Sequence, residues 1–258
     1  MPITQNVIIE DAELPATLPC MVGSPLPSGS ETGFTPSPVF SPLDIAGASL
    51  WLRADLGIIV ATGVSAWTDQ SGNGNVFIQA VPGNQPNYTT NVYNGEPAVG
   101  GPDAARYLQC AAIATLGTSA SIVITCSQSS VASAYIATPD GANNAFLSHF
   151  SGSAFEWYNG TGSDRYTFAS TPTAGLHQLI VTQTDGVSLI GYYDGVQVFS
   201  ATPTVTINRQ FKNVCGRGTG VNGTNGSVVE CVTYSGVVLT PFQVEQLHAY
   251  SKNFWGSP

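Results

Sequence analysis

The sequence predicts an all-β protein: an antiparallel two-sheet jelly-roll sandwich, preceded by an extended Pro-rich N-terminal arm and closed by a short C-terminal helix. Charged residues make up only 9% of the chain, against 43% hydrophobic residues. This uncharged, polar composition suits strands and turns, and it deprives helices of Glu, Lys and Arg. Short runs of β-branched and aromatic residues also alternate with turns rich in Gly, Asn and Asp.

The most informative of these turns is residues 67–75, WTDQSGNGN. A large aromatic residue, Trp67, leads directly into a segment where Gly supplies positive φ and Asp, Ser and Asn bond their own backbone. No helix can run through such a segment. A strand that ends at a buried Trp before a tight reversal is typical of the corner of a β-sandwich.

Further along the chain, the pattern predicts a series of strands and one helix. The hairpin 177–199 carries two type I′ signals, Asp185-Gly186 and Asp194-Gly195. A helix is expected to begin after the N-cap Thr240 and to stop at Gly256. The other strands are expected at residues 50–52, 65–67, 98–99, 106–110, 121–127, 134–137, 145–150, 154–158 and 228–234.

Composition divides the chain into an arm, residues 1–42, and a sandwich domain, residues 43–258. Proline fixes φ and removes a donor, so the arm is expected to be extended. The same composition is found in disordered linkers, and that alternative stays open. Read as an attachment arm, it would contact a partner through Pro25, Pro27, Pro36 and Pro38, and through Val7, Ile8 and Ile9, which could add a strand to a neighbouring sheet.

The charge balance excludes several partners. The chain has 7 basic and 16 acidic residues, a formal net charge of −9, which repels nucleic acid and anionic lipid. No apolar run approaches the roughly 20 residues that span a bilayer, so no membrane role is expected. Residues 1–9 lack the basic residue and apolar core of a secretory signal peptide.

The cysteines and histidines do not form a ligand pattern. The five cysteines, Cys20, Cys110, Cys126, Cys215 and Cys231, are expected to be free thiols, with a Cys215–Cys231 bridge as the alternative. The histidines His149, His177 and His248 are interpreted as structural.

Two motif-like strings are rejected. Asp69, Ser71 and Asn73 resemble the start of a calcium loop, but Ala80 stands where the closing acidic residue should be, which favours a turn. The glycine string 218–223 precedes a strand instead of a helix, so it offers no phosphate site. We therefore expect neither a metal nor a cofactor.

The best candidate ligand site surrounds residues 155–166. Sugars bind where an aromatic face covers their apolar side and polar groups bond their hydroxyls. Trp157, Tyr158, Asn159 and Arg165 offer that mixture. The alternative is that one of Phe155 and Trp157, which share one strand face, belongs to the core. A glycosidase would need two acidic residues close together in a cleft, and the candidates are Glu156, Asp164 and Asp185. Their spacing in the sequence does not match that of a catalytic carboxylate pair.

Several segments occur in the order found in concanavalin A-like (laminin-G-like) jelly-roll domains. They are residues 51–55 (WLRAD), 67–75, 85–88 (QPNY), 94–99, 177–182, 192–196 (YYDGV) and 226–234. The chain from 45 to 256 resembles that family, whose members include lectins, adhesins, virion proteins and glycosidases. The opening behind a short arm is similar to jelly rolls of bacteriophage virion proteins, among them decoration, fibre and tail components.

These observations together predict a non-enzymatic virion protein. The arm would bind capsid or tail proteins, and the head would project outward and could contact host cell-surface glycans. The protein would be assembled in the host cytoplasm and located in the virion. A carbohydrate-binding lectin or adhesin is the alternative, a glycoside hydrolase is the third candidate, and a homo-oligomer is left open.

Overall fold

The computed structural model describes residues 40–102, 106–111, 116–128, 134–138, 147–150, 154–158, 165–169, 174–203, 210–216 and 225–258. The chain divides into two units, Met1–Val39 and Phe40–Pro258. The predicted arm contacts Val7, Ile8, Ile9, Pro25, Pro27, Pro36 and Pro38 lie outside the described residues, as does Cys20. Phe40 and Pro42 belong to the second unit: the Phe40 ring meets Tyr250 edge-on at 6.3 Å, and the Tyr234 hydroxyl donates to the Pro42 carbonyl.

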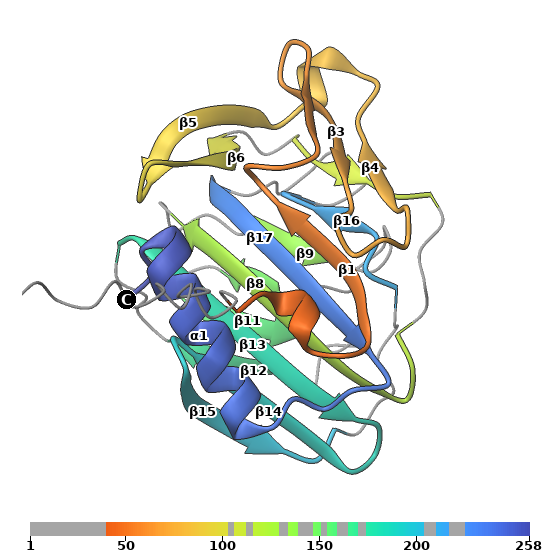
Figure 1. Ribbon diagram of the computed structural model, residues 1–258, viewed down its shortest axis with the longest axis vertical. Helices are drawn as coiled ribbons and strands as arrows, with labels where there is room; N and C mark the ends of the chain where they lie inside the picture. The colour runs from red at the N-terminus through yellow and green to blue at the C-terminus, as the bar shows by residue number, and fades with distance from the viewer. Residues whose placement is uncertain are drawn as a thin grey trace, which may run out of the picture. The chain divides into compact units, whose positions relative to one another are not determined.

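The second unit is the expected antiparallel β-sandwich (Figure 1). An 8-stranded sheet has the order β15-β14-β13-β8-β17-β6-β5, and β1 also pairs with β17. Its strands are β1 (Ala48–Arg53), β5 (Asn87–Tyr93), β6 (Glu96–Pro102), β8 (Ser119–Gln128), β13 (Leu176–Thr184), β14 (Ser188–Tyr193), β15 (Val196–Ala201) and β17 (Asn225–Ser235).

The second sheet is 9-stranded, with the order β12-β11-β10-β9-β16-β7-β4-β3-β2. Four of its strands, β2, β4, β12 and β16, were not predicted. Of these, β2, β4 and β16 have only two or three residues, which are too few to show periodicity. Its strands are β2 (Ile58–Val60), β3 (Val64–Thr68), β4 (Val76–Ile78), β7 (Leu108–Gln109), β9 (Ala134–Thr138), β10 (Leu147–Phe150), β11 (Ala154–Tyr158), β12 (Arg165–Ala169) and β16 (Asn213–Val214). Two 3-10 turns, η1 (Pro42–Asp44) and η2 (Pro82–Asn84), lie in the connections.

The main core lies between the two sheets. Side chains alternate along each strand, so every second residue points into this layer. Trp67, Phe77, Phe155 and Leu108 are completely buried there. The Trp67 indole also donates to the carbonyl of Arg53 at 2.8 Å, which holds the corner predicted from residues 67–75.

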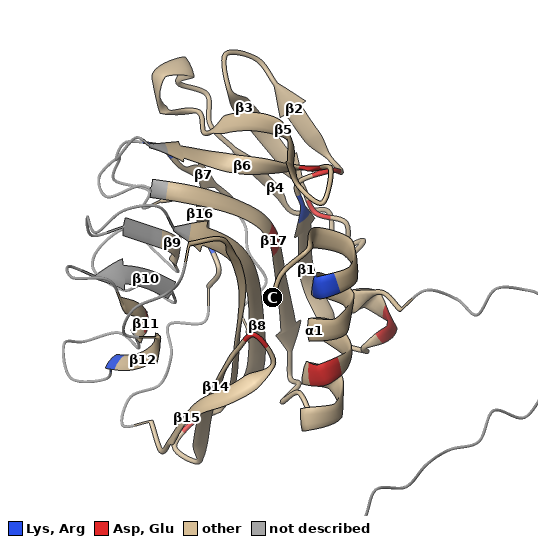
Figure 2. Ribbon diagram, turned by 90° about the vertical axis from the view of Figure 1, so that its left-hand side faces the viewer, with Lys and Arg blue, Asp and Glu red and all other residues tan. Residues whose placement is uncertain are grey.

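The helix α1 (Pro241–Trp255) covers the outer face of the 8-stranded sheet. In Figure 2, α1 lies on one side of this sheet and strands β11 and β12 lie on the other. Val244 and Leu247 pack on Trp51, Ile180 and Val232 in a second apolar cluster. The predicted ends are confirmed: Thr240 and Gln243 form a capping box, and Gly256 adopts the left-handed conformation.

The two Asp-Gly turns of the hairpin differ. Asp194 and Gly195 both have positive φ, 48° and 76°, as the type I′ prediction requires. The Asp185-Gly186 prediction is wrong in its turn type, because only Gly186 has positive φ there. The connection runs from Thr184 to Ser188 and so holds one residue more than a two-residue turn.

No helix among the described residues has the length and apolar character needed to cross a bilayer.

Candidate functional site

The structure separates the predicted glycan residues. Strands β11 and β12 pair so that Trp157 faces Tyr166, and Tyr158 pairs with Arg165. Trp157 is only 1% exposed. Strand alternation places Trp157 and Phe155 on the same inward face, and both are buried in the core, where the sequence predicted one of them. Trp157 is therefore not a surface platform for a sugar, which corrects that expectation.

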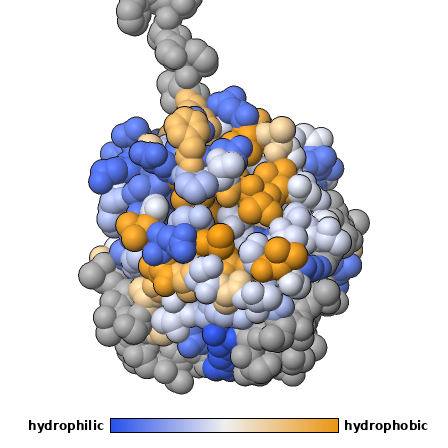
Figure 3. All heavy atoms as spheres, turned by 90° about the horizontal axis from the view of Figure 1, so that it is seen from below, coloured by the Kyte–Doolittle hydropathy of each residue, from blue (hydrophilic) through white to orange (hydrophobic). Residues whose placement is uncertain are grey.

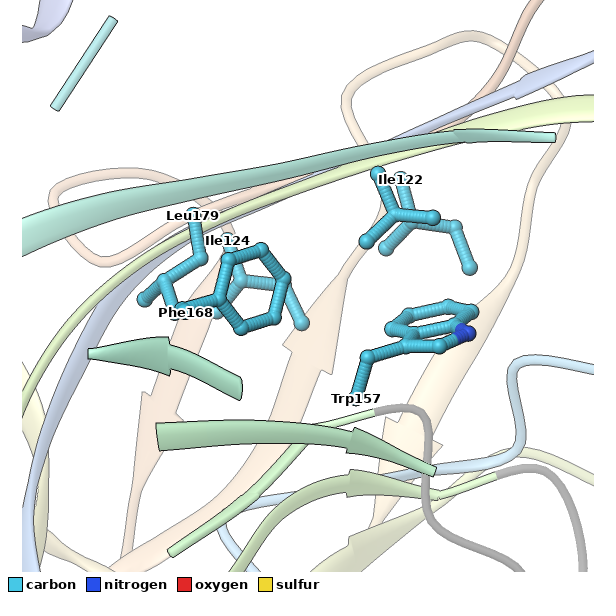
Figure 4. A pocket seen from close by; sticks show the side chains of 6 residues that line it. Ile122, Ile124, Trp157, Phe168 and Leu179 are labelled. Atoms are coloured by element: carbon cyan, nitrogen blue, oxygen red, sulfur yellow. The ribbon is translucent and has the colours of Figure 1, made fainter. Parts of the chain in front are cut away.

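Inside the sandwich, Trp157 lines a small apolar cavity (Figure 4). Its indole lies opposite Ile122, and Phe168 lies beside Leu179 and Ile124. Val181 completes the lining of this cavity. With no polar side-chain atom other than the indole nitrogen among its lining residues, it is a packing defect of the core that offers no groups to orient a polar ligand.

The outward face of the same two strands carries charge. Glu156 pairs with Thr167, one position before Trp157, so its side chain points away from the core. A guanidinium nitrogen of Arg165 lies 3.9 Å from a carboxylate oxygen of Glu156, and the two side chains are 41% and 16% exposed. In this ion pair, the β11–β12 pair, the Arg165 side chain is exposed but the Glu156 oxygen that faces it is buried and accepts no hydrogen bond. The pair is what the structure retains of the predicted site. The Tyr158 side chain, Asn159 and Asp164 lie outside the described residues.

The calcium-like segment is a turn, as the sequence favoured. The Asp69 carboxylate accepts hydrogen bonds from the backbone N–H groups of Trp51 and Ser71, each at 2.8 Å. It also accepts from the Ser71 hydroxyl at 2.8 Å and from the Asn75 amide at 2.7 Å. In the part of the chain that the structure describes, no three His, Cys, Asp or Glu side chains are grouped to hold a metal ion.

His177 is tied to the neighbouring hairpin. Its Nδ1 lies 2.7 Å from the Asp194 carboxylate, whose other oxygen accepts from the Gln178 N–H at 2.8 Å. The imidazole stacks on Tyr193 with ring centroids 4.8 Å apart. These contacts give His177 a structural role at the start of β13.

Cys126 is the register partner of His177 on β8, which places a thiol, an imidazole and the Asp194 carboxylate in sequence across the sheet. Such a set activates a nucleophile only if the thiolate is accessible. Cys126 is completely buried, and burial together with the Asp194 charge raises the pKa of its thiol. The thiol therefore stays protonated. Cys126, Cys215 and Cys231 are free thiols and are buried, so the alternative of a Cys215–Cys231 bridge is wrong. The Cys110 side chain is buried as well.

A buried carboxylate, Glu230, escaped sequence reasoning. It lies on the outward face of β17, under α1, and is 1% exposed. Its carboxylate accepts from the Trp51 indole at 2.7 Å, the Tyr250 hydroxyl at 2.9 Å and the Trp255 indole at 3.1 Å. Burial raises its pKa to about 7, although the three donors and the charge of Arg53 act in the opposite direction. The only signal in the sequence is an acidic residue inside the apolar run 228–232.

Arg53 completes the contact between β1 and the end of α1. Its guanidinium lies 4.4 Å from the Phe254 ring centroid and 5.1 Å from that of Trp51. Two of its nitrogens donate to the Asp55 carboxylate, at 3.0 and 2.7 Å. Cation–π contacts of this kind hold a helix end in place. Glu230 and Arg53 thus attach α1 to the outer face of the 8-stranded sheet. The 9-stranded sheet takes no part in these contacts.

No family model matches the sequence, and no curated protein matches it. Solved structures are similar in fold. The sialidase of Trypanosoma rangeli in complex with sialic acid has a TM-score of 0.57 at 13% identity, over 83% of this chain and 34% of that one.

Two toxin-type domains are similar over a comparable part of the chain. The ligand binding domain of botulinum neurotoxin serotype D, in complex with N-acetylneuraminic acid, has a TM-score of 0.60 at 12% identity, over 82% of this chain and 54% of that one. The binding domain of Paraclostridial Mosquitocidal Protein 1 has a TM-score of 0.55 at 12% identity, over 82% and 55% of the two chains.

This chain spans between a third and just over half of the length of these proteins. At such identities the likeness concerns the fold alone. The protein is a β-sandwich of the jelly-roll type found in these sialidase and toxin binding domains.

Proposed function

We propose that this protein is a non-enzymatic carbohydrate-binding module. Its fold supports the proposal, since structures similar to its sandwich include a sialidase in complex with sialic acid and a toxin ligand binding domain in complex with N-acetylneuraminic acid. This favours the lectin alternative of the sequence analysis over a purely structural role.

The observation that carries the proposal is the outward β11–β12 pair. An Arg guanidinium presents a fork of donors that matches a carboxylate, and an acidic side chain accepts hydrogen bonds from hydroxyl groups. Arg165, with 41% of its side chain exposed, stands beside Glu156 on a strand at the end of the 9-stranded sheet. An acidic sugar, such as a sialylated glycan, supplies both the carboxylate and the hydroxyls.

The test is a glycan array probed with the full chain, followed by titration of the best ligand against the Arg165→Ala variant. We expect sialylated glycans to bind and the substitution to lower their affinity at least about tenfold, because a charge-assisted hydrogen bond is lost. Lys252→Ala, which removes an exposed cation on α1, is the matched control and should bind like the wild type. A blank array, or an Arg165→Ala variant with unchanged affinity, contradicts the proposal.

Trp157→Ala should act on stability and so cannot report on sugar contact. Removing a buried indole beside an existing cavity is expected to lower the free energy of unfolding by about 3–5 kcal/mol. Urea denaturation of the variant measures this, and Arg165→Ala should stay within about 0.5 kcal/mol of the wild type. A Trp157→Ala variant as stable as the wild type would show that the indole lies outside the core.

The non-enzymatic part of the proposal is tested by incubating the protein with any glycan that the array identifies. Release of reducing sugar would contradict the non-enzymatic proposal and would show instead that the protein is a glycoside hydrolase, the third candidate function.

We further propose a virion setting for the module, with attachment to capsid or tail proteins through residues 1–42. This rests on the proline-rich composition of that segment and on the resemblance to phage jelly rolls. Mass spectrometry of purified particles should detect the chain, and its absence from them would end this part of the proposal.

A further inference from the structure

The hairpin formed by β5 and β6 lies against the end of α1 (Figure 1, Figure 2). Its turn is Asn94-Gly95, and both residues have positive φ, 50° and 86°, as a two-residue type I′ turn requires. The side-chain nitrogen of Asn94 donates to the backbone carbonyls of Asn253 and Phe254, at 3.1 and 2.9 Å. A residue of the sheet therefore caps the last turn of the helix.

This cap satisfies groups that the helix cannot satisfy by itself. The last four carbonyl groups of an α-helix have no partner within the helix. Here the Gly256 N–H donates to the Lys252 carbonyl at 3.1 Å, and Asn94 supplies donors for the two carbonyls that follow. The end of the helix is also the negative end of its dipole, so it favours a hydrogen-bond donor and disfavours a negative charge.

The same dipeptide is chemically labile. Asparagine is one of the thermolabile residues. A glycine that follows it has no Cβ to shield its backbone nitrogen, which can then approach the asparagine side chain. Asn94 and Gly95 are both exposed, so water reaches the turn.

We propose that Asn94 is a site of spontaneous deamidation, that the docking of α1 controls the reaction, and that the reaction releases the end of the helix. The Gly95 backbone nitrogen gives its proton to hydroxide and attacks the side-chain carbonyl carbon, Cγ, of Asn94. A new C–N bond closes a succinimide ring. The bond from Cγ to the side-chain nitrogen breaks, and this nitrogen takes a proton from water and leaves as ammonia. Water then opens the ring to aspartate or isoaspartate, so the net change consumes water, releases ammonia and needs no oxidant or reductant.

The docked helix holds Asn94 in an unreactive arrangement. Ring closure requires the side chain to turn back toward the Gly95 nitrogen, whereas the two hydrogen bonds hold the amide against α1. The turn itself is fixed by Tyr93 and Glu96, which are paired at the ends of the two strands. The reaction therefore proceeds from molecules in which the end of α1 has separated from the hairpin. Its rate follows the population of that open state.

The product cannot restore the cap. A carboxylate has no hydrogen to donate, so the carbonyls of Asn253 and Phe254 lose their donor. It also places a negative charge at the negative end of the helix dipole, and the charge of Lys252 in the same turn does not replace the lost donors. Isoaspartate in addition lengthens the backbone of a two-residue turn. Each conversion therefore makes a reversible opening of α1 permanent.

Peptide mass spectrometry of the full chain, incubated at mildly alkaline pH, tests the control by the helix, because exchange of an amide NH2 for OH changes the peptide mass. We expect Asn94 to deamidate at least about tenfold more slowly in the folded chain than in urea. In Phe254→Ala its rate should rise at least about fivefold. The lost ring lies 4.4 Å from the Arg53 guanidinium and stacks on Tyr250 at 5.8 Å, so its removal weakens the docking of the helix end.

Asn73, which Gly74 follows, is the reference within the same molecule. Its amide donates to the β1 carbonyls of Ala48 and Ser49, at 3.3 and 3.2 Å, so its rate should not change in Phe254→Ala.

Phe242→Ala is the matched control, because it removes a phenylalanine that is 66% exposed at the start of α1. The start of α1 lies toward the lower end of Figure 1, and Figure 3 shows that end from below, with apolar and polar residues interspersed. The β5–β6 hairpin lies toward the other end. The rate at Asn94 should therefore equal that of the wild type.

Asn94→Asp tests the release of the helix, because it introduces one of the products and tolerates the positive φ of the turn. Measured by hydrogen exchange, the backbone amides of residues 252–256 should exchange at least about tenfold faster than in the wild type. Unchanged exchange there would contradict the release.

Three results would contradict the control by the helix. They are an Asn94 that reacts equally fast in the folded chain and in urea, an unchanged rate in folded Phe254→Ala, and a rise in that variant that Asn73 shares. None of them bears on glycan binding, because the array and the Arg165→Ala variant report on β11 and β12.

Discussion

Glu230 shows how a single side chain can fasten an element to a sheet. A carboxylate in an apolar layer is destabilising unless its oxygens are bonded, and here two indoles and a tyrosine hydroxyl donate to it. Trp51 comes from β1, while Tyr250 and Trp255 come from α1. One acceptor therefore links three elements. Burial still prevails over these donors and raises its pKa to about 7.

This pKa predicts a specific dependence of stability on pH. Since the pKa of Glu230 rises from the ordinary 4.5 to about 7 on folding, the folded state binds its proton more tightly than the unfolded state. The stabilisation is complete below pH 4.5 and is lost as the pH rises through 7, by about 3 kcal/mol in all. The free energy of unfolding of the wild type, relative to Glu230→Gln, should therefore fall over this interval. Urea denaturation at several pH values measures the difference.

Glu245→Gln, at an exposed position of α1, is the control and should keep the wild-type pH dependence. If the free energies of unfolding of the wild type and Glu230→Gln changed in parallel with pH, Glu230 would not titrate between pH 4.5 and pH 7.

At the scale of elements, the hairpin β13–β14–β15 and α1 depend on each other through a turn. Gly195 follows Asp194 in the β14–β15 turn, and a Cβ placed on it would lie 2.8 Å from Cδ2 of His248 on α1. Glycine is needed there for two reasons: its positive φ, and the approach of the helix. At Gly186, in the preceding turn, only the first reason applies, because a Cβ would meet nothing within 4 Å.

The two glycines therefore predict different responses to the same change. Gly186→Ala should lower the free energy of unfolding by about 1 kcal/mol, the strain of alanine at φ 65°. Gly195→Ala should lower it by at least about 2 kcal/mol, since the methyl group also displaces the His248 ring. Chemical denaturation compares the two. In a His248→Ala background the Gly195→Ala penalty should approach that of Gly186→Ala, and an unchanged penalty would rule out the ring contact.

At the scale of the molecule, the layer between the sheets protects the described thiols. Cys110, Cys126, Cys215 and Cys231 are buried in a continuous apolar core that also contains Trp67, Phe77 and Phe155. Burial raises the pKa of Cys126, Cys215 and Cys231, which keeps them protonated as well as inaccessible.

We therefore expect at most one thiol per native chain to react with Ellman's reagent, that of Cys20, against all five in denaturant. The four protected thiols should react only as fast as the sandwich unfolds. Rapid reaction of a second thiol in native protein would show that the core opens locally. Fewer than five reactive thiols in denaturant, with no reductant present, would reveal a disulfide.

Most of the fold could be predicted because its signals are local. Asp194-Gly195, the Thr240 capping box and Gly256 each fix their own backbone, and their predicted roles are confirmed. The alternating run 121–127 predicted β8 because strand periodicity needs only a few residues to show itself. Strands such as β16, with two residues, carry no such signal and form only because longer neighbours provide the pairing.

The candidate site was harder to predict because it depends on which face of a strand points outward. Sequence alternation groups Phe155 with Trp157 and separates both from Glu156, but it does not say which set is buried. The 8-stranded sheet settles this, because Ile122 on its strand β8 covers Trp157. Arg165 stays beside Glu156 on the other face of β11 and β12.

The sequence by itself determined the β class, the corner at residues 67–75, the Asp194-Gly195 turn, the helix and its ends, and a composition poor in charge, because these follow from backbone preferences and composition. Only the tertiary structure decided that Trp157 is core, that Glu230 is an anchor for α1, and that Asn94 caps the end of α1. The physical reason is that a side chain becomes buried only when a second layer of the fold packs against its own layer. The two layers come from segments far apart in the chain, and no local sequence pattern contains that information.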